Sequence, residues 1–172
     1  MATNLQFINS FEITSAVSSL NCDNVFTAEY DVYKIVATKL ETAGSTANGN
    51  LRLIDSSGNV ESSSYDFAYL SMKPESSFGE VKVIGGTFWQ EFFGNPDKAP
   101  QGSGTIGYIY NPFDSSSYTF CNWQSFHSQG SVNRGYKAIG VHKFAESMRG
   151  FQLQESLGNN ITAGTISVYG VK

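Results

Sequence analysis

The sequence contains few charged residues. Lys, Arg, Asp and Glu together make up 15% of its 172 residues, and the formal net charge is -4. Nucleic-acid binding needs a cationic face that neutralises phosphates, and an anionic membrane surface attracts clusters of basic residues. The sequence offers neither pattern. We therefore expect no nucleic-acid partner and no attachment to a membrane surface.

Long apolar runs are also missing. A membrane-spanning helix needs about 18 or more apolar residues in a row, and the sequence has no such stretch, so we expect no membrane insertion. The first residues, Met1 to Gln6, show neither a cationic region nor an apolar run, so we expect no signal peptide. The apolar fraction of 40% nevertheless exceeds that of a disordered chain. We expect one domain spanning residues 1–172, with a sizeable core.

Histidine and cysteine are scarce, with two residues of each. His127 and His142 lie in or beside strand-like segments, and we expect both to be ordinary strand or loop residues. Cys22 and Cys121 are far apart in the sequence; we expect two buried thiols, with a disulfide as the alternative. These four residues lack the paired spacing of zinc ligands. We therefore predict no metal site and no cofactor.

Motifs for catalysis are weak. The pattern Gly102-x-Gly104-x-x-Gly107 matches a dinucleotide-binding fingerprint, but it leads into a strand-like segment at 106–110 instead of opening a helix. No Gly-x-Ser-x-Gly elbow occurs. We expect the carboxylates to be solvated surface acids, with a glycosidase pair as the alternative; they include Glu41, Glu61, Asp66, Glu75, Glu80 and Glu91. The sequence thus predicts no catalytic residues and a non-enzymatic protein.

The sequence is rich in aromatic residues, at 14%, and it has 17 glycines. Apolar residues recur with a period of two, as in Tyr65, Phe67 and Tyr69, which is typical of strands with one face inward. Clusters rich in Gly, Asn and Ser separate these segments. We predict an all-β, antiparallel β-sandwich, jelly-roll-like, with about ten short strands. They lie near Phe11, Leu20, Tyr33, Leu53, Phe67, Phe88, Tyr108, Phe120, Ile139 and the pair Phe151 and Val168.

Helix signals are poor, because only Phe144, Met148 and Phe151 fall at helical spacing and Gly150 interrupts them. We expect at most a short helical turn there. The segment 30–40 is apolar on both faces, which indicates a central strand of a sheet.

Five segments together resemble a β-sandwich domain found in virion proteins of tailed bacteriophages, notably marine and cyanobacterial ones. They are residues 18–27, 30–36, 108–114, 140–142 leading to 150–153, and 158–172, the last of which ends in Ser-Val-Tyr-Gly-Val-Lys. The resemblance implies a structural or fibre-associated virion component, and it implies no catalytic residues. The longer fibre proteins also carry an attachment domain and a stalk, and we expect neither in this protein. We therefore expect a small decoration protein, a head-fibre knob or a minor component.

The first functional hypothesis is a virion structural protein, localised to the virion, that binds other virion proteins of the capsid, neck or tail. Most homo-oligomers are symmetric, and we expect a symmetric homo-oligomer here. The alternative is a carbohydrate-binding receptor-recognition module on the tail or head surface, with a host surface glycan as its ligand. Its candidate contacts are Trp89, Phe93 and Trp123, because aromatic rings stack on sugars. For these three rings, a place in the core is the competing expectation.

Overall fold

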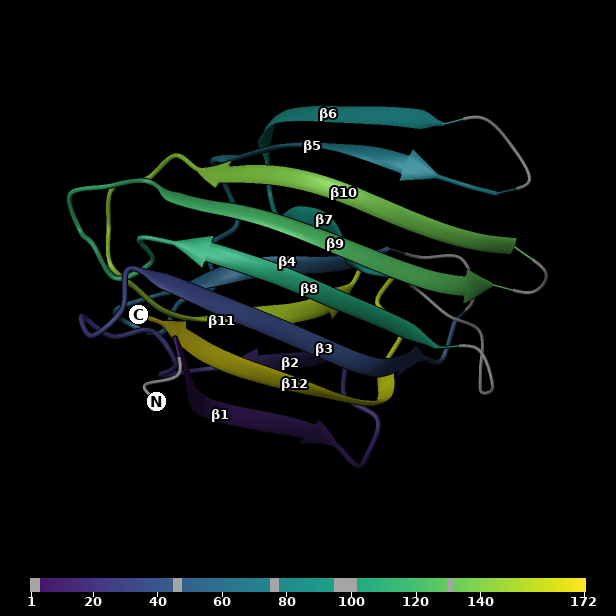
Figure 1. The fold of residues 1–172 in the computed structure, drawn as a ribbon, viewed down its shortest axis with the longest axis horizontal. Coiled ribbons are helices and arrows are strands. Elements are labelled where there is room, and N and C mark those ends of the chain that lie inside the picture. Colours follow the sequence, from purple (N-terminus) through teal and green to yellow (C-terminus); the bar gives the residue numbers. More distant parts are fainter. Residues whose placement is uncertain (1–3, 45–47, 75–77, 95–101, 130–131) are drawn as a thin grey trace.

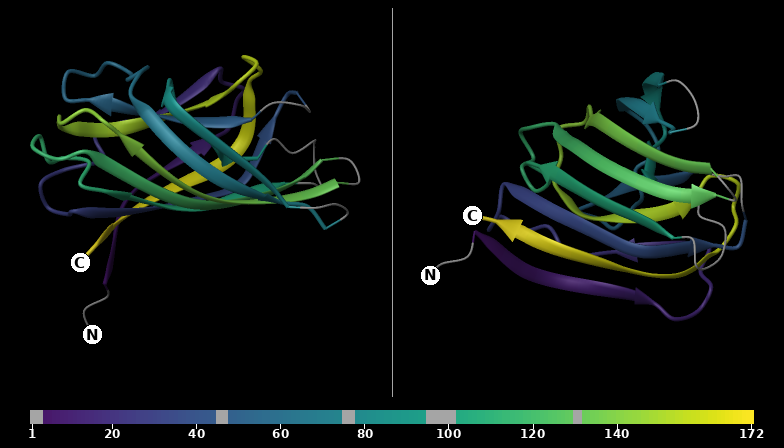
Figure 2. Two further views of the ribbon diagram at one scale, coloured as in Figure 1. Left: turned by 90° about the horizontal axis from the view of Figure 1, so that it is seen from above. Right: turned by 45° about the vertical axis from the view of Figure 1, so that its right-hand side comes forward.

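The computed structural model describes residues 4–44, 48–74, 78–94, 102–129 and 132–172. Throughout these ranges the regular structure is β-strand: twelve strands form two antiparallel sheets that pack face to face (Figures 1 and 2). This confirms the predicted all-β sandwich. Within the same ranges, no helix has the length and apolar character needed to cross a bilayer. Glu75 lies outside the described residues.

The larger sheet has eight strands in the order β1-β12-β3-β8-β9-β10-β5-β6, and every neighbouring pair is antiparallel. The strands are β1 (Leu5–Ile13), β3 (Val32–Thr42), β5 (Tyr65–Met72), β6 (Gly79–Gly86), β8 (Ser103–Tyr110), β9 (Thr119–Gln129), β10 (Val132–His142) and β12 (Ile161–Val171).

The smaller sheet has four strands in the order β2-β11-β4-β7. They are β2 (Ser19–Cys22), β4 (Gly49–Asp55), β7 (Trp89–Phe93) and β11 (Met148–Glu155). The chain crosses repeatedly between the two sheets, for example from β4 to β5 and from β10 to β11. The β4–β5 loop and the β10–β11 loop lie side by side, because Lys143 N donates to Ser64 O at 2.9 Å.

Strand parity decides which side chains enter the core. In β9, Cys121 and Trp123 point toward the small sheet and are buried, whereas Phe120 and Gln124 point the other way and are exposed. The central strand β3 follows the same rule, because Tyr33, Ile35 and Ala37 are all buried. The small sheet covers this inner side of the large sheet (Figure 2). In the part of the chain that is described, no second layer covers the outer side.

Hydrogen bonds between the sheets fix their relative position. Three inward polar side chains of the large sheet donate to main-chain carbonyls of β7: Trp123 Nε1 to Glu91 at 2.9 Å, Ser125 Oγ to Glu91 at 2.7 Å, and Thr105 Oγ1 to Phe92 at 2.6 Å. Each bond satisfies a donor that the apolar core would otherwise leave unpaired.

Two elements differ from the expectations of the sequence. Strand β6 was not predicted, because it is an edge strand whose side chains are mostly exposed and therefore need no apolar alternation. The helical spacing of Met148 and Phe151 is misleading, because both lie in strand β11 and are buried by it. A bulge between Met148 and Gly150 in the pairing with β4 brings the two residues onto one face.

Candidate functional site

The three aromatic residues predicted as ligand contacts lie in the core. Trp89 and Phe93 are 0% exposed and Trp123 is 1% exposed. The rings of Trp89 and Trp123 face each other across the sandwich with centroids 6.4 Å apart. Strands β7 and β9 turn these positions inward, so none of the three rings forms a surface platform. The expectation that they contact a ligand is corrected accordingly.

The uncovered outer side of the large sheet provides a different surface. We call it the outer face, and it is formed by outward side chains of β5, β8, β9 and β10. Cross-strand register arranges them in rows that cross these strands. One row runs through Ile106, Gln124, Lys137 and Leu70, the next through Tyr108, Asn122, Ile139 and Ala68, and a third through Gly104, Phe126, Gly135 and Met72.

Large apolar side chains stand exposed in these rows. The exposed fraction is 66% for Ile139, 63% for Phe126 and 52% for Leu70. Phe126 lies over Gly104 of the neighbouring strand, where a side chain on that glycine would collide with its ring. The ring of Phe126 therefore covers the main chain of β8 at this position, and the exposed apolar side chains of the outer face cluster on neighbouring strands.

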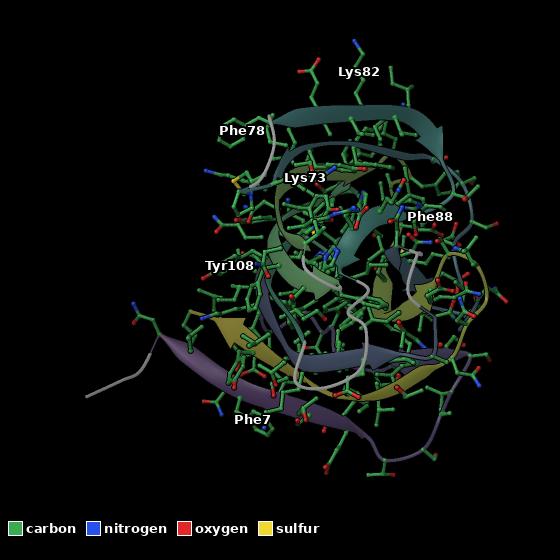
Figure 3. All side chains as sticks on the ribbon, turned by 90° about the vertical axis from the view of Figure 1, so that its right-hand side faces the viewer. Phe7, Lys73, Phe78, Lys82, Phe88 and Tyr108 are labelled. Carbon is green, nitrogen blue, oxygen red and sulfur yellow. The ribbon has the colours of Figure 1, made fainter. Side chains whose placement is uncertain are left out.

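Two of the depressions on the outer face adjoin each other and share Asn122 and Gln124. One, of about 770 Å³, includes Leu70, Lys137 and Ile139 in its lining and reaches Lys82 of β6. The other, of about 430 Å³, is lined by residues that include Ile106, Tyr108, Met72 and Phe126. Figure 3 shows Tyr108 on the side of the molecule opposite to Phe88, which precedes β7 of the small sheet.

Polar groups are placed among the apolar ones. The amide nitrogen of Asn122 donates to the hydroxyl of Tyr110 at 2.7 Å, which holds the amide beside the ring. Gln124 and Lys137 are exposed in the neighbouring row. This combination can bind a partner by apolar contact, and it can orient the partner through amide and ammonium hydrogen bonds.

The sequence alone did not single out the outer face. A period of two shows that a strand has two faces, but it does not show which face is covered. The available signal was that β9 and β10 carry large apolar residues at both parities, Trp123 and Phe126 in β9 and Tyr136 and Ile139 in β10. A strand that is covered on only one side normally has polar residues on its other side.

Fold and surface together define a β-sandwich protein with one large, partly apolar sheet face that no other described segment of the chain covers. No protein-family model matches the sequence, and no curated protein matches it either. We therefore infer a function from the outer face and from the side chains of the described residues.

Proposed function

We propose that this chain is a non-enzymatic structural protein of a bacteriophage particle, which decorates the head or forms a small fibre or knob component. In this proposal the outer face binds another virion protein. Two independent features support it: the sequence segments that resemble phage β-sandwich domains, and the large apolar side chains exposed on the outer face. The exposed apolar side chains are the main support, because they are observed in the folded structure.

An antiparallel sheet that faces water on one side normally alternates apolar-in with polar-out. Here the outward positions of the central strands hold Phe126, Ile139 and Leu70, each more than half exposed. Contiguous apolar surface on a soluble protein typically marks an interaction site. A protein partner suits this face better than a nucleic acid, because the net charge of the chain is -4. Repeated copies in a symmetric particle would convert modest contacts into firm attachment.

The test is quantitative mass spectrometry of purified particles from the source lysate, in which the chain is counted relative to the major capsid protein. A copy number similar to that of the capsid protein is expected for a head decoration, and a few copies per particle for a tail, neck or vertex component. Absence of the chain from the particles would contradict the proposal.

Matched variants test the role of the outer face. Ile139→Lys places a charge in its centre, whereas Leu157→Lys places one at a loop position with a similar exposed fraction, 66% against 68%. Both side chains are exposed, so both variants are expected to fold. We expect Ile139→Lys to reduce co-sedimentation with particles at least tenfold and Leu157→Lys to leave it unchanged. Equal behaviour of the two variants would exclude the outer face as the attachment surface.

A specific observation also favours the second candidate, a receptor-recognition module that binds a host glycan. The hollowed outer face places Tyr108 and Tyr110 beside the amides of Asn122 and Gln124, a combination that suits sugar rings and their hydroxyls. A glycan array tests this candidate. Binding that Tyr108→Ala abolishes, and that Tyr118→Ala in the β8–β9 loop leaves intact, would support it. The absence of binding to any glycan would reject it.

A further inference from the structure

Three side chains that are distant in the sequence converge at one end of the sandwich. Glu61 lies in the loop between β4 and β5, His142 is the last residue of β10, and Glu146 lies in the loop between β10 and β11. A main-chain hydrogen bond from Lys143 N to Ser64 O, at 2.9 Å, joins the two loops, and Glu61 N donates to Leu53 O of β4 at 2.9 Å. One ligand atom from each of the three side chains lies within 4.8 Å of the other two.

His142 is the buried member of this group. Its side chain is 0% exposed, and neither ring nitrogen has a hydrogen-bond partner among the described residues. Its Nε2 atom lies 3.9 Å from Oε2 of Glu61. The ring of Tyr65 packs against the imidazole with centroids 4.7 Å apart and so restricts its orientation. A buried imidazole without partners is costly, and its lone pair is available to a ligand.

The main-chain carbonyl of Ser63 lies near the imidazole, although it forms no hydrogen bond with the ring in this structure. A carbonyl close to the ring is a common neighbour of metal-binding histidines.

The two glutamates lack a compensating cation. The negative charge of Asp55 reaches both carboxylates, and the charge of Glu61 also reaches Glu146. The Oε1 atom of Glu146 is buried and has no hydrogen-bond partner among the described residues. Asp55 itself accepts hydrogen bonds from Asn59. Negative charge therefore accumulates beside the imidazole of His142.

The nearby basic side chains are engaged elsewhere. Arg149 donates two hydrogen bonds to the carboxylate of Asp23, although its charge also reaches Asp55. Lys143 pairs with Asp66 at 2.8 Å. Neither cation hydrogen-bonds to Glu61 or Glu146 among the described residues. A bound cation would balance the charge of these two carboxylates.

We propose that Glu61, His142 and Glu146 form a binding site for a divalent transition-metal ion of the zinc class. One imidazole nitrogen and two carboxylate oxygens suit Zn²⁺, whereas Ca²⁺ and Mg²⁺ take oxygen ligands. Tetrahedral zinc with bonds of about 2.1 Å holds its ligands roughly 3.4 Å apart, a separation that the flexible glutamates reach by small rotations. Water would complete the coordination.

The location of this site indicates its role. The β4–β5 loop and the β10–β11 loop each connect the small sheet with the large sheet. A metal ion held by both loops would link the two sheets at this end of the sandwich and stabilise the folded chain, because binding to the native state alone adds to its stability. This structural role is independent of what the outer face binds.

The test uses tag-free, chelator-treated protein. Titration calorimetry with ZnCl2 is expected to show one ion per chain, and zinc is expected to raise Tm by about 5 °C or more, while CaCl2 is not. Co²⁺ in place of zinc is expected to produce visible d–d absorption bands. No zinc binding by the wild-type chain at micromolar concentrations would overturn the proposal.

Variants separate this site from adventitious binding. Glu146→Gln removes a charge in a half-exposed loop and is expected to weaken zinc binding roughly tenfold or more. Glu61→Gln serves as a second variant, in case the first does not fold. Glu41→Gln, at the opposite end of the large sheet, is the matched control and should bind zinc like the wild type. Equal zinc affinity in Glu146→Gln, Glu61→Gln and the wild type would also overturn the proposal.

Discussion

The indole N–H of Trp123 donates a hydrogen bond of 2.9 Å to the main-chain carbonyl of Glu91, and this bond joins β9 of the large sheet to β7 of the small one. The hydroxyl of Ser125 donates to the same carbonyl at 2.7 Å. One main-chain group of a short strand thus receives two donors from the opposite sheet. The ring of Trp123 also packs against Trp89 and Phe92, so polar and apolar contacts coincide at this point.

We therefore expect Trp123→Phe to destabilise the protein by about 2 kcal/mol, because it removes one buried hydrogen bond and leaves a small cavity. Urea unfolding followed by circular dichroism measures the change. Phe120→Leu is the control, since Phe120 lies three residues away on the exposed side of the same strand. A loss of stability no larger than that of the control would show that the contact between the sheets contributes little.

The alternation of apolar residues was sufficient to predict much of this fold. Tyr65, Phe67 and Tyr69 were expected on one face of a strand, and all three are buried. The edge strand β6 was not predicted. Most of its side chains are exposed, so the order of its apolar and polar residues does not reflect a buried face. The pairing order of the strands was not predicted either, since it depends on contacts between residues far apart in the sequence.

The candidate sites were harder to predict. Ligand contacts were predicted at Trp89, Phe93 and Trp123 because their rings are aromatic. The side chains of all three point into the core. His142 was expected to be an ordinary strand residue, and Glu61 a solvated acid. Their proximity arises only when β10 pairs with β5, so that His142 lies opposite Tyr65. No local spacing in the sequence encodes that contact.

The core of the large sheet should not tolerate a charge. Ile35 is 0% exposed at the centre of β3, and Ile35→Asp would bury a carboxylate without a partner, which is expected to prevent folding. Ile84→Asp is the matched control, because Ile84 is 82% exposed on the edge strand β6. Circular dichroism and size-exclusion chromatography should show a folded control and an unfolded or aggregated Ile35 variant. A soluble, cooperatively unfolding Ile35→Asp protein would contradict the strand register.

The two cysteines should be unreactive in the native protein. Both are free and buried, which agrees with the expectation of buried thiols, and burial raises the pKa of each thiol well above its usual value. Thiolate is the reactive form, so we expect negligible reaction with Ellman's reagent under native conditions. Unfolding in guanidinium without reductant should expose two thiols per chain. Rapid labelling of the native protein, or the absence of free thiols after unfolding, would disagree with this arrangement.

The stability of the fold should depend on the protonation of Glu91. Glu91 is 4% exposed, and burial raises its pKa from 4.5 to about 7, although Arg134 and Tyr136 oppose the shift. Between these two pH values the native state holds more protons on this group than the unfolded state does. The contribution of Glu91 to the free energy of unfolding therefore decreases as pH rises through this window, and it is least favourable above about pH 7.

Glu91→Gln isolates this effect, because the amide stays neutral at every pH and can still accept a hydrogen bond from Tyr136. Burial lowers the pKa of His127 to about 4, which makes the native state less stable as pH falls below 6.5. Both proteins share this opposing contribution, so it cancels in the difference between them. We expect the stability of the variant relative to the wild type to increase from pH 5 to pH 8 by up to about 3 kcal/mol. Denaturant unfolding at both pH values measures the difference. A difference that is the same at both pH values would show that Glu91 ionises in the folded protein as it does in the unfolded chain.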